Sequence, residues 1–253
     1  MTAKAHKQGI AWWKWALLPL MLAVTAQCYF WAGSFQGFQM PEAMRIVFWH
    51  VPQAILSLVW YGVAAFYGYR YLASRDLFDD TRSSVAAEIA LLVTILAAAS
   101  GAIFAYVQWG AAWSWDIKQV GITLLMSLYL AYFVLRASIS EPRTRASLSA
   151  AYAIFGVFAA VFCYYVLPRF VDTLHPGTDV IRSGMDAAYR TTFWMSVLGF
   201  FGFTLWSYQL KLRVERVADA LAARASSPAT ADERLEPVRR QPVAEPVGRT
   251  GGD

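Results

Sequence analysis

The sequence predicts an all-α, polytopic integral membrane protein, built as a bundle of six transmembrane helices with both termini in the cytoplasm. Composition is the first reason: the 253 residues are 58% hydrophobic and only 15% charged, whereas soluble domains carry about 25% charged residues. The second reason is six apolar segments, each about 20 residues long, which is enough to cross the hydrocarbon of a bilayer. The third is that no β-barrel alternation occurs, and helices satisfy their own backbone groups in lipid.

The six predicted helices follow one another along residues 13–213. The first apolar segment is too long for a cleaved signal peptide and has no small-residue cleavage site, so it is interpreted as a spanning helix. The next four are separated by basic or tryptophan-rich loops, and the sixth ends where the composition becomes charged. We expect the spans at residues 13–33, 46–72, 85–107, 119–137, 149–168 and 191–213.

The distribution of Lys and Arg predicts the orientation of the bundle. Cytoplasmic loops carry the excess of positive charge. One side of the bundle holds the larger basic set, namely Lys4, Lys7, Lys14, Arg70, Arg75, Arg82, Arg136, Arg143, Arg145, Lys211, Arg213 and Arg216. Both termini therefore lie inside, and loops 34–45, 108–118 and 169–190 face a periplasm-like space.

The chain divides by composition into two parts. Residues 1–213 form the predicted six-helix transmembrane domain, with loop 108–118 facing the periplasm. Residues 214–253 are rich in Ala, Arg, Pro and Glu and form a cytoplasmic tail. Within the tail, residues 214–225 could extend the last helix, and residues 226–253 are predicted to be disordered.

Several kinds of site are excluded by the residues available. Cys28 and Cys163 lie in different apolar segments, and no Cys-x-x-Cys or Cys-x-x-Cys-His occurs. Thiol-redox chemistry, a common zinc site and covalent c-type haem attachment are therefore not predicted. The net charge of +5 comes from loops and tail, so nucleic acid is not predicted as a partner.

Two histidines and a tryptophan-rich loop converge on the outer side of the membrane. The loop reads QWGAAWSWDIKQ at residues 108–119. His50 lies near the outer start of the second predicted helix and His175 lies in the last outward loop, whereas His6 lies in the polar N-terminal segment. Haem iron takes one or two axial ligands, and the macrocycle needs an aromatic surface. Its propionates need cations, for which the candidates on this side are Arg45, Lys118, Arg169, Arg182 and Arg190.

Simpler interpretations of the same residues remain open. The indoles could form an interfacial aromatic belt, and a single histidine in an apolar helix is often a hydrogen-bonded core residue. Asp116 is predicted to be the N-cap of the fourth helix, with Gln119 as its capping-box partner. Lys118 opposes the helix dipole in the first turn, so we expect it to reach an anion, either a lipid phosphate or a propionate.

Three motifs together resemble a known family. WGAAWSWD is similar to the WWD signature of the cytochrome c assembly proteins, and RIVFWHVPQAI and DTLHPG are similar to the histidine segments of one member family. That family is haem exporter protein C (CcmC) of the cytochrome c maturation system. The resemblance covers residues 45–213. The chain departs from the signature at Ala112, where the family has a further Trp.

The resemblance implies a haem-binding membrane protein rather than an enzyme. It implies non-covalent haem b in transit, axial ligation by His50 and His175, and a platform made of Trp109, Gly110, Trp113, Trp115 and Asp116. Arg45 and Lys118 are expected to belong to the cofactor-binding residues as well. The implied location is the bacterial inner membrane, and the implied partners are a periplasmic haem chaperone (CcmE-like), ABC-type transporter subunits and a small single-helix membrane protein.

Two other functions are compatible with the residues. One is a haem-b membrane anchor subunit of a quinone oxidoreductase, in which histidines would normally lie buried inside the bundle. The other is a haem-free transporter or scaffold with an aromatic belt, although such transporters often show internal repeats and intramembrane charges. Both remain open on sequence grounds.

Overall fold

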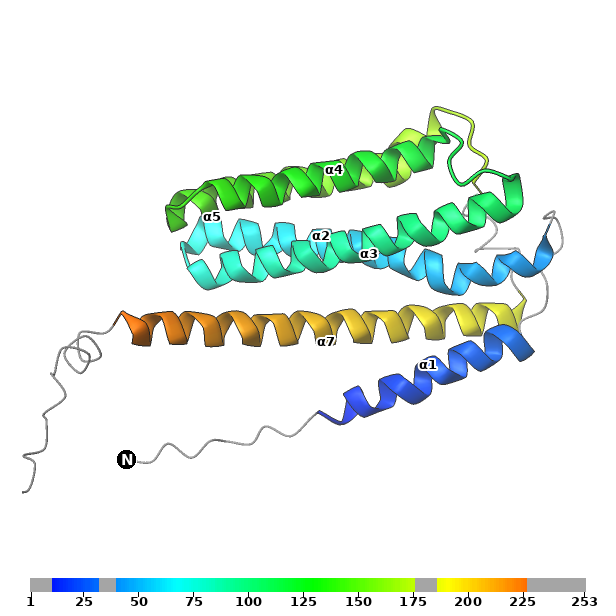
Figure 1. Ribbon diagram of the computed structural model, residues 1–253, viewed down its shortest axis with the longest axis horizontal. Helices are drawn as coiled ribbons and strands as arrows, with labels where there is room; N and C mark the ends of the chain where they lie inside the picture. Colours follow the sequence, from blue (N-terminus) through cyan, green and yellow to red (C-terminus); the bar gives the residue numbers. More distant parts are fainter. Residues whose placement is uncertain (1–10, 32–39, 176–185, 227–253) are drawn as a thin grey trace, which may run out of the picture. The chain divides into compact units, whose positions relative to one another are not determined.

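The protein is helical throughout the residues that the computed structural model describes, which are 11–31, 40–175 and 186–226 (Figure 1). These ranges contain no strand, so the all-α prediction is confirmed. The long helices are α1 (Trp12–Phe30), α2 (Val47–Ser74), α3 (Leu77–Trp109), α4 (Ile117–Ser138), α5 (Pro142–Val161) and α7 (Ala187–Ala225). Three short elements complete the order: the 3₁₀ turn η1 (Pro41–Ile46), the π-helical turn η2 (Phe162–Val166) and the 3₁₀ turn η3 (Leu167–Arg169).

Two helices begin earlier than predicted because acidic side chains cap them. Asp76 accepts a hydrogen bond from the backbone N–H of Phe78, so α3 starts at Leu77 rather than at residue 85. Glu141 accepts hydrogen bonds from the backbone N–H groups of Arg143 and Thr144, so α5 starts at Pro142 rather than at residue 149. A side-chain oxygen satisfies backbone donors that the first helical turn leaves without partners.

Four helical segments of the described residues are long and apolar enough to cross a membrane. They are Glu42–Ser74, Leu77–Trp109, Ile117–Ser138 and Pro142–Arg169. Helices α1 and α7 are not among them, because their apolar stretches are less hydrophobic than those of the other four. Length and composition therefore support a multi-pass membrane protein with four spans of this kind.

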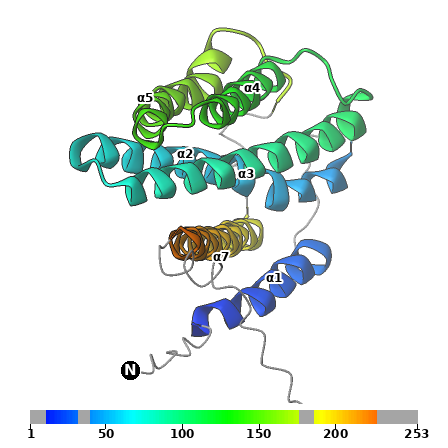
Figure 2. The same ribbon diagram turned by 60° about the vertical axis from the view of Figure 1, so that its left-hand side comes forward.

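Helices α2 and α3 pack side by side, with α4 and α5 on one side of this pair and residues 187–212 of α7 on the other (Figures 1 and 2). Small residues bring the backbones close, as is usual between membrane helices. A Cβ atom added to Gly68 of α2 would lie 3.2 Å from the Ala150 backbone of α5. The core is rich in tyrosine, and the rings of Tyr61 and Tyr129 stack with centroids 3.8 Å apart.

A proline in α2 frees a backbone carbonyl that accepts a hydrogen bond from α7, close to His50. Pro52 lies inside α2 and has no N–H, so the carbonyl of Phe48 four residues earlier loses its helical partner. The hydroxyl of Ser196 on α7 donates a hydrogen bond to that carbonyl. The neighbouring turn is held as well, because the Tyr189 hydroxyl donates to the carbonyl of Met44 at 2.7 Å. The turn η1 and the first turn of α2 are thus anchored to α7.

Buried charges lie at the start of α3, at the end of the bundle away from loop 108–118. Asp79 and Asp80 are both buried. Asp79 pairs with Arg70 and Arg82, and Asp80 receives two hydrogen bonds from the Arg136 guanidinium at 2.7 and 3.0 Å. A buried carboxylate is stable only with such partners, so these pairs tie α2, α3 and α4 together.

The chain forms two compact units, residues 1–212 and 213–253. In the second unit the described residues continue α7 as far as Ala225, as the sequence suggested for residues 214–225. Val214, Val217 and Leu221 are exposed on this extension. The predicted disorder of residues 226–253 falls almost entirely outside the described residues.

Candidate functional site

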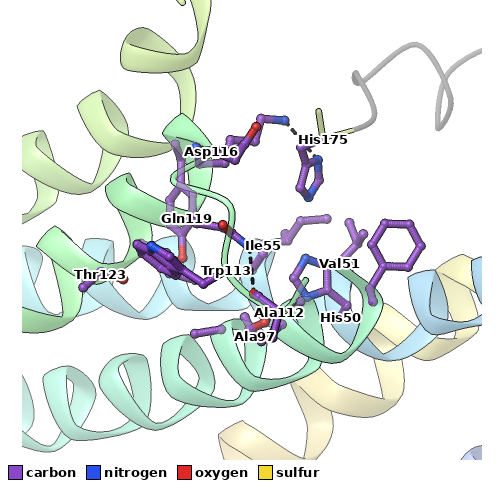
Figure 3. Close-up of a pocket in the computed structure, with 18 of the residues that line it drawn as sticks. His50, Val51, Ile55, Ala97, Ala112, Trp113, Asp116, Gln119, Thr123 and His175 are labelled. Carbon is purple, nitrogen blue, oxygen red and sulfur yellow. Dashed lines mark hydrogen bonds between the residues drawn. The ribbon is translucent and has the colours of Figure 1, made fainter. Parts of the chain in front are cut away.

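A cavity of about 580 Å³ opens between α2, α3 and α4 beneath loop 108–118 (Figure 3). Its size lies within the range of about 300–1,000 Å³ that is typical of small-molecule and cofactor sites. The walls are mostly apolar, with a few polar groups among them. They come from His50, Val51, Ala54, Ile55 and Leu58 of α2, Ala97, Ala98, Gly101, Ala102 and Phe104 of α3, Trp109, Ala112, Trp113 and Asp116 around the loop, Lys118, Gln119, Ile122 and Thr123 of α4, and Tyr164, Tyr165, Arg169 and His175.

His50 is held in the tautomer that suits a metal ligand. Its Nδ1 lies 2.9 Å from the carbonyl oxygen of Ala97 and 3.1 Å from the hydroxyl of Ser100. A carbonyl can only accept, so Nδ1 carries the proton and the lone pair of the neutral ring is on Nε2. A ligating histidine commonly donates its other N–H to a backbone carbonyl in this way. The wall of α3 therefore orients His50 before any ligand binds.

His175 is held in the opposite tautomer by Lys118. The ammonium Nζ of Lys118 lies 3.3 Å from His175 Nδ1. A charged Lys118 has donors and no acceptor, so in contact with it the neutral His175 ring accepts at Nδ1 and carries its proton on Nε2. In this state His175 is positioned near the cavity but does not present a lone pair from Nε2.

The two imidazoles lie at a separation that suits a shared metal ion. Figure 3 shows the His175 ring directed toward His50 across the cavity, and the ring centroids are 6.0 Å apart with an interplanar angle of 41°. A metal lies about 2.0 Å from an imidazole nitrogen, which itself lies about 1.1 Å from the ring centre, so two opposed axial imidazoles have centroids about 6.2 Å apart. The observed separation matches this value closely.

Asp116 connects the start of α4 with the segment that carries His175. It is the N-cap of α4, because Oδ1 accepts a hydrogen bond from the Lys118 backbone N–H at 2.9 Å. Its Oδ2 accepts from the Thr173 hydroxyl at 2.8 Å and from the Leu174 N–H at 2.7 Å. Burial alone would raise the pKa of Asp116, but these hydrogen bonds outweigh it and hold the pKa below its usual value.

The capping-box part of the prediction is wrong. The Gln119 side chain accepts from the backbone N–H of Ser114 at 2.9 Å and donates to the carbonyl of Ala112 at 3.0 Å. In a capping box the Gln119 side chain would accept from the Asp116 N–H. Here it contacts Ser114, two residues earlier, because the loop folds over the first turn of α4.

The predicted platform residues divide into two groups. Trp109, Trp113 and Asp116 line the cavity. Trp115 does not; its side chain is 78% exposed and its backbone adopts φ of +58°, which is unusual for a bulky residue. Gly110 ends α3 with φ of +77° and donates its N–H to the Tyr106 carbonyl, so its role in the described structure is a helix C-cap.

The candidate cations also differ in position. Lys118 and Arg169 line the cavity. Arg45 does not line it and pairs instead with Glu42 at 2.7 Å, and Arg190, in the first turn of α7, does not line it either. Arg182 lies outside the described residues, so its predicted role remains untested.

Several cavity residues escaped the sequence analysis. Gly101 packs so closely that an added Cβ would lie 2.9 Å from Cε1 of His50. Ala97 and Ser100 belong to the same small-residue stretch, which is a known sign of a close helix contact in membranes. Tyr164 comes from the π-helical turn η2, and its hydroxyl lies 3.0 Å from Ser57 Oγ. A π-helical turn often marks a functional site, but the sequence carries no clear signal for it.

Comparison with known proteins identifies the family. Residues 2–230 match the family described as heme exporter protein C, CcmC. The heme exporter protein C of Paracoccus denitrificans is 27% identical over 217 residues, which are 82% of this chain and 90% of the relative. That of Escherichia coli K12 is 26% identical over 166 residues, 64% of this chain and 66% of the relative. A putative cytochrome c biosynthesis ccmC-like mitochondrial protein of Marchantia polymorpha is 31% identical over 93 residues, 37% of this chain and 41% of the relative.

The family match spans most of the chain, including both histidines and the tryptophan-rich loop. The resemblance to this family, which three short motifs indicated, is thereby confirmed over residues 2–230. This chain belongs to the heme exporter protein C family.

Proposed function

We propose that this protein binds haem in the cavity beneath loop 108–118 and passes it on during the maturation of c-type cytochromes. The observation that carries the proposal is the pair of imidazoles, His50 and His175, at 6.0 Å between centroids on one mostly apolar cavity. The relatives are named for haem export, which agrees with a mostly apolar cavity of about 580 Å³. The protein binds and transfers, and it catalyses no reaction of its own.

The chain's residues fit a haem held by two axial histidines without covalent attachment. His50 and His175 would hold the iron, and Trp109 and Trp113 would contact the macrocycle. Lys118 and Arg169 are the cavity cations for the propionates. The bound haem would supply only its iron and its planar surface for recognition.

The two tautomers suggest an order of binding. His50 already presents Nε2 and would engage first. His175 can present Nε2 only when its proton moves to Nδ1, which requires the Lys118 ammonium to leave that nitrogen. Lys118 can then donate to an anion such as a propionate. Engaging His175 would therefore cost more than engaging His50, and a second ligand that is held less firmly would suit release to an acceptor.

The acceptor in this proposal is a periplasmic haem chaperone of the CcmE kind. The exposed indole of Trp115 lies outside the cavity and offers an apolar contact for a partner. The further partners are ABC-type transporter subunits and a small single-helix membrane protein, as the family resemblance implies. Haem-loaded protein mixed with the purified chaperone should lose its haem to it, and the absence of any transfer would contradict this step.

An absorption spectrum of the detergent-purified protein tests the axial ligands. The wild type should carry haem with the low-spin spectrum of two axial imidazoles. His50→Ala and His175→Ala should each lose this low-spin spectrum, and added imidazole should restore part of it. His6→Ala, which replaces the third histidine of the chain, is the matched control and should resemble the wild type. Unchanged haem content and spectra in both cavity variants would refute the proposal.

The proposed topology is six spans in the bacterial inner membrane, with loop 108–118 in the periplasm and both termini in the cytoplasm. Contacts along the chain support spanning positions for both helices: α7 packs on α2 through Tyr208 and Trp60, and α1 is joined to α7 because Gln27 accepts a hydrogen bond from Thr192 at 3.0 Å. Reporter fusions after residues 111 and 140 should report opposite sides of the membrane. Equal activity of both reporters would contradict the topology.

No observation favours either rival function. A quinone oxidoreductase anchor would be expected to show quinone-linked electron transfer, and a haem-free transporter would purify without a Soret band even after haem supply. The same spectroscopic sample distinguishes both from the proposed function.

A further inference from the structure

The carboxylate of Asp116 joins two segments that are far apart in the sequence. Oδ1 caps α4 through the Lys118 N–H, and Oδ2 accepts from the Thr173 hydroxyl and the Leu174 N–H. The Thr173 hydroxyl oxygen in turn accepts from the His175 N–H at 3.1 Å. The backbone on the N-terminal side of His175 is therefore fixed to the start of α4 through one buried carboxylate.

This segment has little regular structure to hold it in place. Helical turns end at Arg169 with η3, and residues 170–175 follow in irregular conformation. Phe170, Val171 and Leu174 are exposed. A histidine carried by such a segment has no helix to fix its distance from His50, in contrast to His50 itself, which lies within α2. Its position must come from contacts such as those of Asp116.

We propose that Asp116 is a positioning residue that tethers the His175 segment to α4 and so holds the second imidazole within bonding distance of an iron bound to His50. This inference rests on the proposed function, because it assigns Asp116 a role in that same haem site. Asp116 itself contacts neither iron nor macrocycle in this role. It acts through Thr173 and Leu174, and its effect appears at His175.

The geometry explains why a carboxylate is needed. The side chain must accept three hydrogen bonds, one at Oδ1 and two at Oδ2. An ionised carboxylate is acceptor-only at both oxygens, whereas an amide has one oxygen and one donor nitrogen. Asn at this position can therefore cap α4 or hold the His175 segment, but it cannot accept at both ends.

Thr173 allows the tether to be tested without disturbing the α4 cap. Thr173→Val removes the hydroxyl that links Asp116 to the His175 N–H, and Thr173→Ser keeps that hydroxyl. Asp116→Asn is the direct variant, and Glu141→Ala is the matched control, because Glu141 caps α5 through two backbone N–H groups in an exposed position outside the cavity. His175→Ala serves as the reference for complete loss of the second ligand.

The measurements are the spin state of the bound haem in each purified full-length protein and the rate of haem loss to an apoglobin scavenger. Hydrogen bonds to a charged group correspond to about tenfold to a hundredfold in an equilibrium. Thr173→Val and Asp116→Asn should therefore shift the spectrum toward that of His175→Ala and raise the loss rate about tenfold or more. Added imidazole should restore the low-spin spectrum, and Thr173→Ser and Glu141→Ala should match the wild type.

Two results would overturn the inference while leaving the proposed function intact. One is a wild-type spectrum and loss rate in both Thr173→Val and Asp116→Asn when His175→Ala has lost the low-spin form. The other is an equal effect of Glu141→Ala, which would show general loosening of the bundle. A wild-type spectrum in His175→Ala would instead refute the proposed function itself, and the tether with it.

Discussion

Gly101 provides the sharpest test of how the cavity holds His50. A Cβ at this position would lie 2.9 Å from Cε1 and 3.4 Å from Nδ1 of His50. Carbon atoms in ordinary contact lie about 3.5–4.0 Å apart. In Gly101→Ala the imidazole must therefore retreat by about 0.6 Å or more, and its hydrogen bonds to Ala97 and Ser100 must stretch.

The expected loss of haem affinity follows from that displacement. A functional site needs its groups within about 0.5 Å of the productive geometry, and an inserted methyl group in a packed interior costs about 1–3 kcal/mol. This corresponds to about fivefold to 150-fold weaker binding. The assay is the rate of haem loss from purified Gly101→Ala protein to an apoglobin scavenger, together with the low-spin fraction in the absorption spectrum.

Gly62→Ala is the matched control on the facing helix. It also introduces a methyl group into the interior of a long helix, but nothing lies within 4 Å of the added Cβ. We expect haem loss at the wild-type rate from this variant. A folded Gly101→Ala protein that retains haem within twofold of the wild type would refute the placement of His50 against α3.

Three further predictions concern other parts of the bundle. Trp113→Ala should raise the rate of haem loss about tenfold, whereas Trp115→Ala should leave it unchanged because that indole lies outside the cavity; equal rates would contradict this division. Asp80→Asn should lower the free energy of unfolding by about 3–5 kcal/mol, since the half-buried Arg136 guanidinium loses its charged partner, and thermal unfolding at an unchanged midpoint would contradict it. Tyr129→Phe should change stability by less than about 0.5 kcal/mol, because the hydroxyl has no hydrogen-bond partner among the described residues, whereas Tyr61→Phe should cost about 0.6–1.7 kcal/mol by breaking its 2.9 Å bond to Thr94. The reverse order in denaturation midpoints would contradict the hydrogen-bond assignment.

The helical architecture could be predicted from sequence because hydrophobic length is a strong signal. The cores of the six predicted segments all lie within observed helices. The starts of α3 and α5 could not be placed from hydropathy, because their first turns are polar and depend on Asp76 and Glu141 as caps. The membrane-spanning character of α1 and α7 remains a prediction.

The convergence of His50 and His175 followed from topology, but their distance did not. Two loops on one side of a membrane can lie anywhere within the width of the bundle, and the contacts that bring these rings together are long-range. Asp116 shows which contacts can be predicted from the sequence and which cannot. Its capping role could be seen locally in the sequence, whereas its bonds to Thr173 and Leu174 join residues far along the chain.

The contribution of small residues was also hidden from the sequence analysis. Gly101 and Ala97 resemble many other small residues in apolar helices, and only packing shows that they form the wall behind His50. Trp115 was grouped with the other indoles by motif alone. Its backbone is left-handed and its side chain does not line the cavity, and no pattern of hydrophobicity predicts that conformation.

The central claim is that two imidazoles of this chain bind one haem iron. The most direct measurement is electron–nuclear double resonance of the oxidised, haem-loaded protein prepared with ¹⁵N-labelled histidine. We predict strong couplings from two labelled axial nitrogens, with one lost in His50→Ala and one lost in His175→Ala. A wild-type spectrum with no labelled axial nitrogen, or with both couplings retained in either variant, would contradict the account.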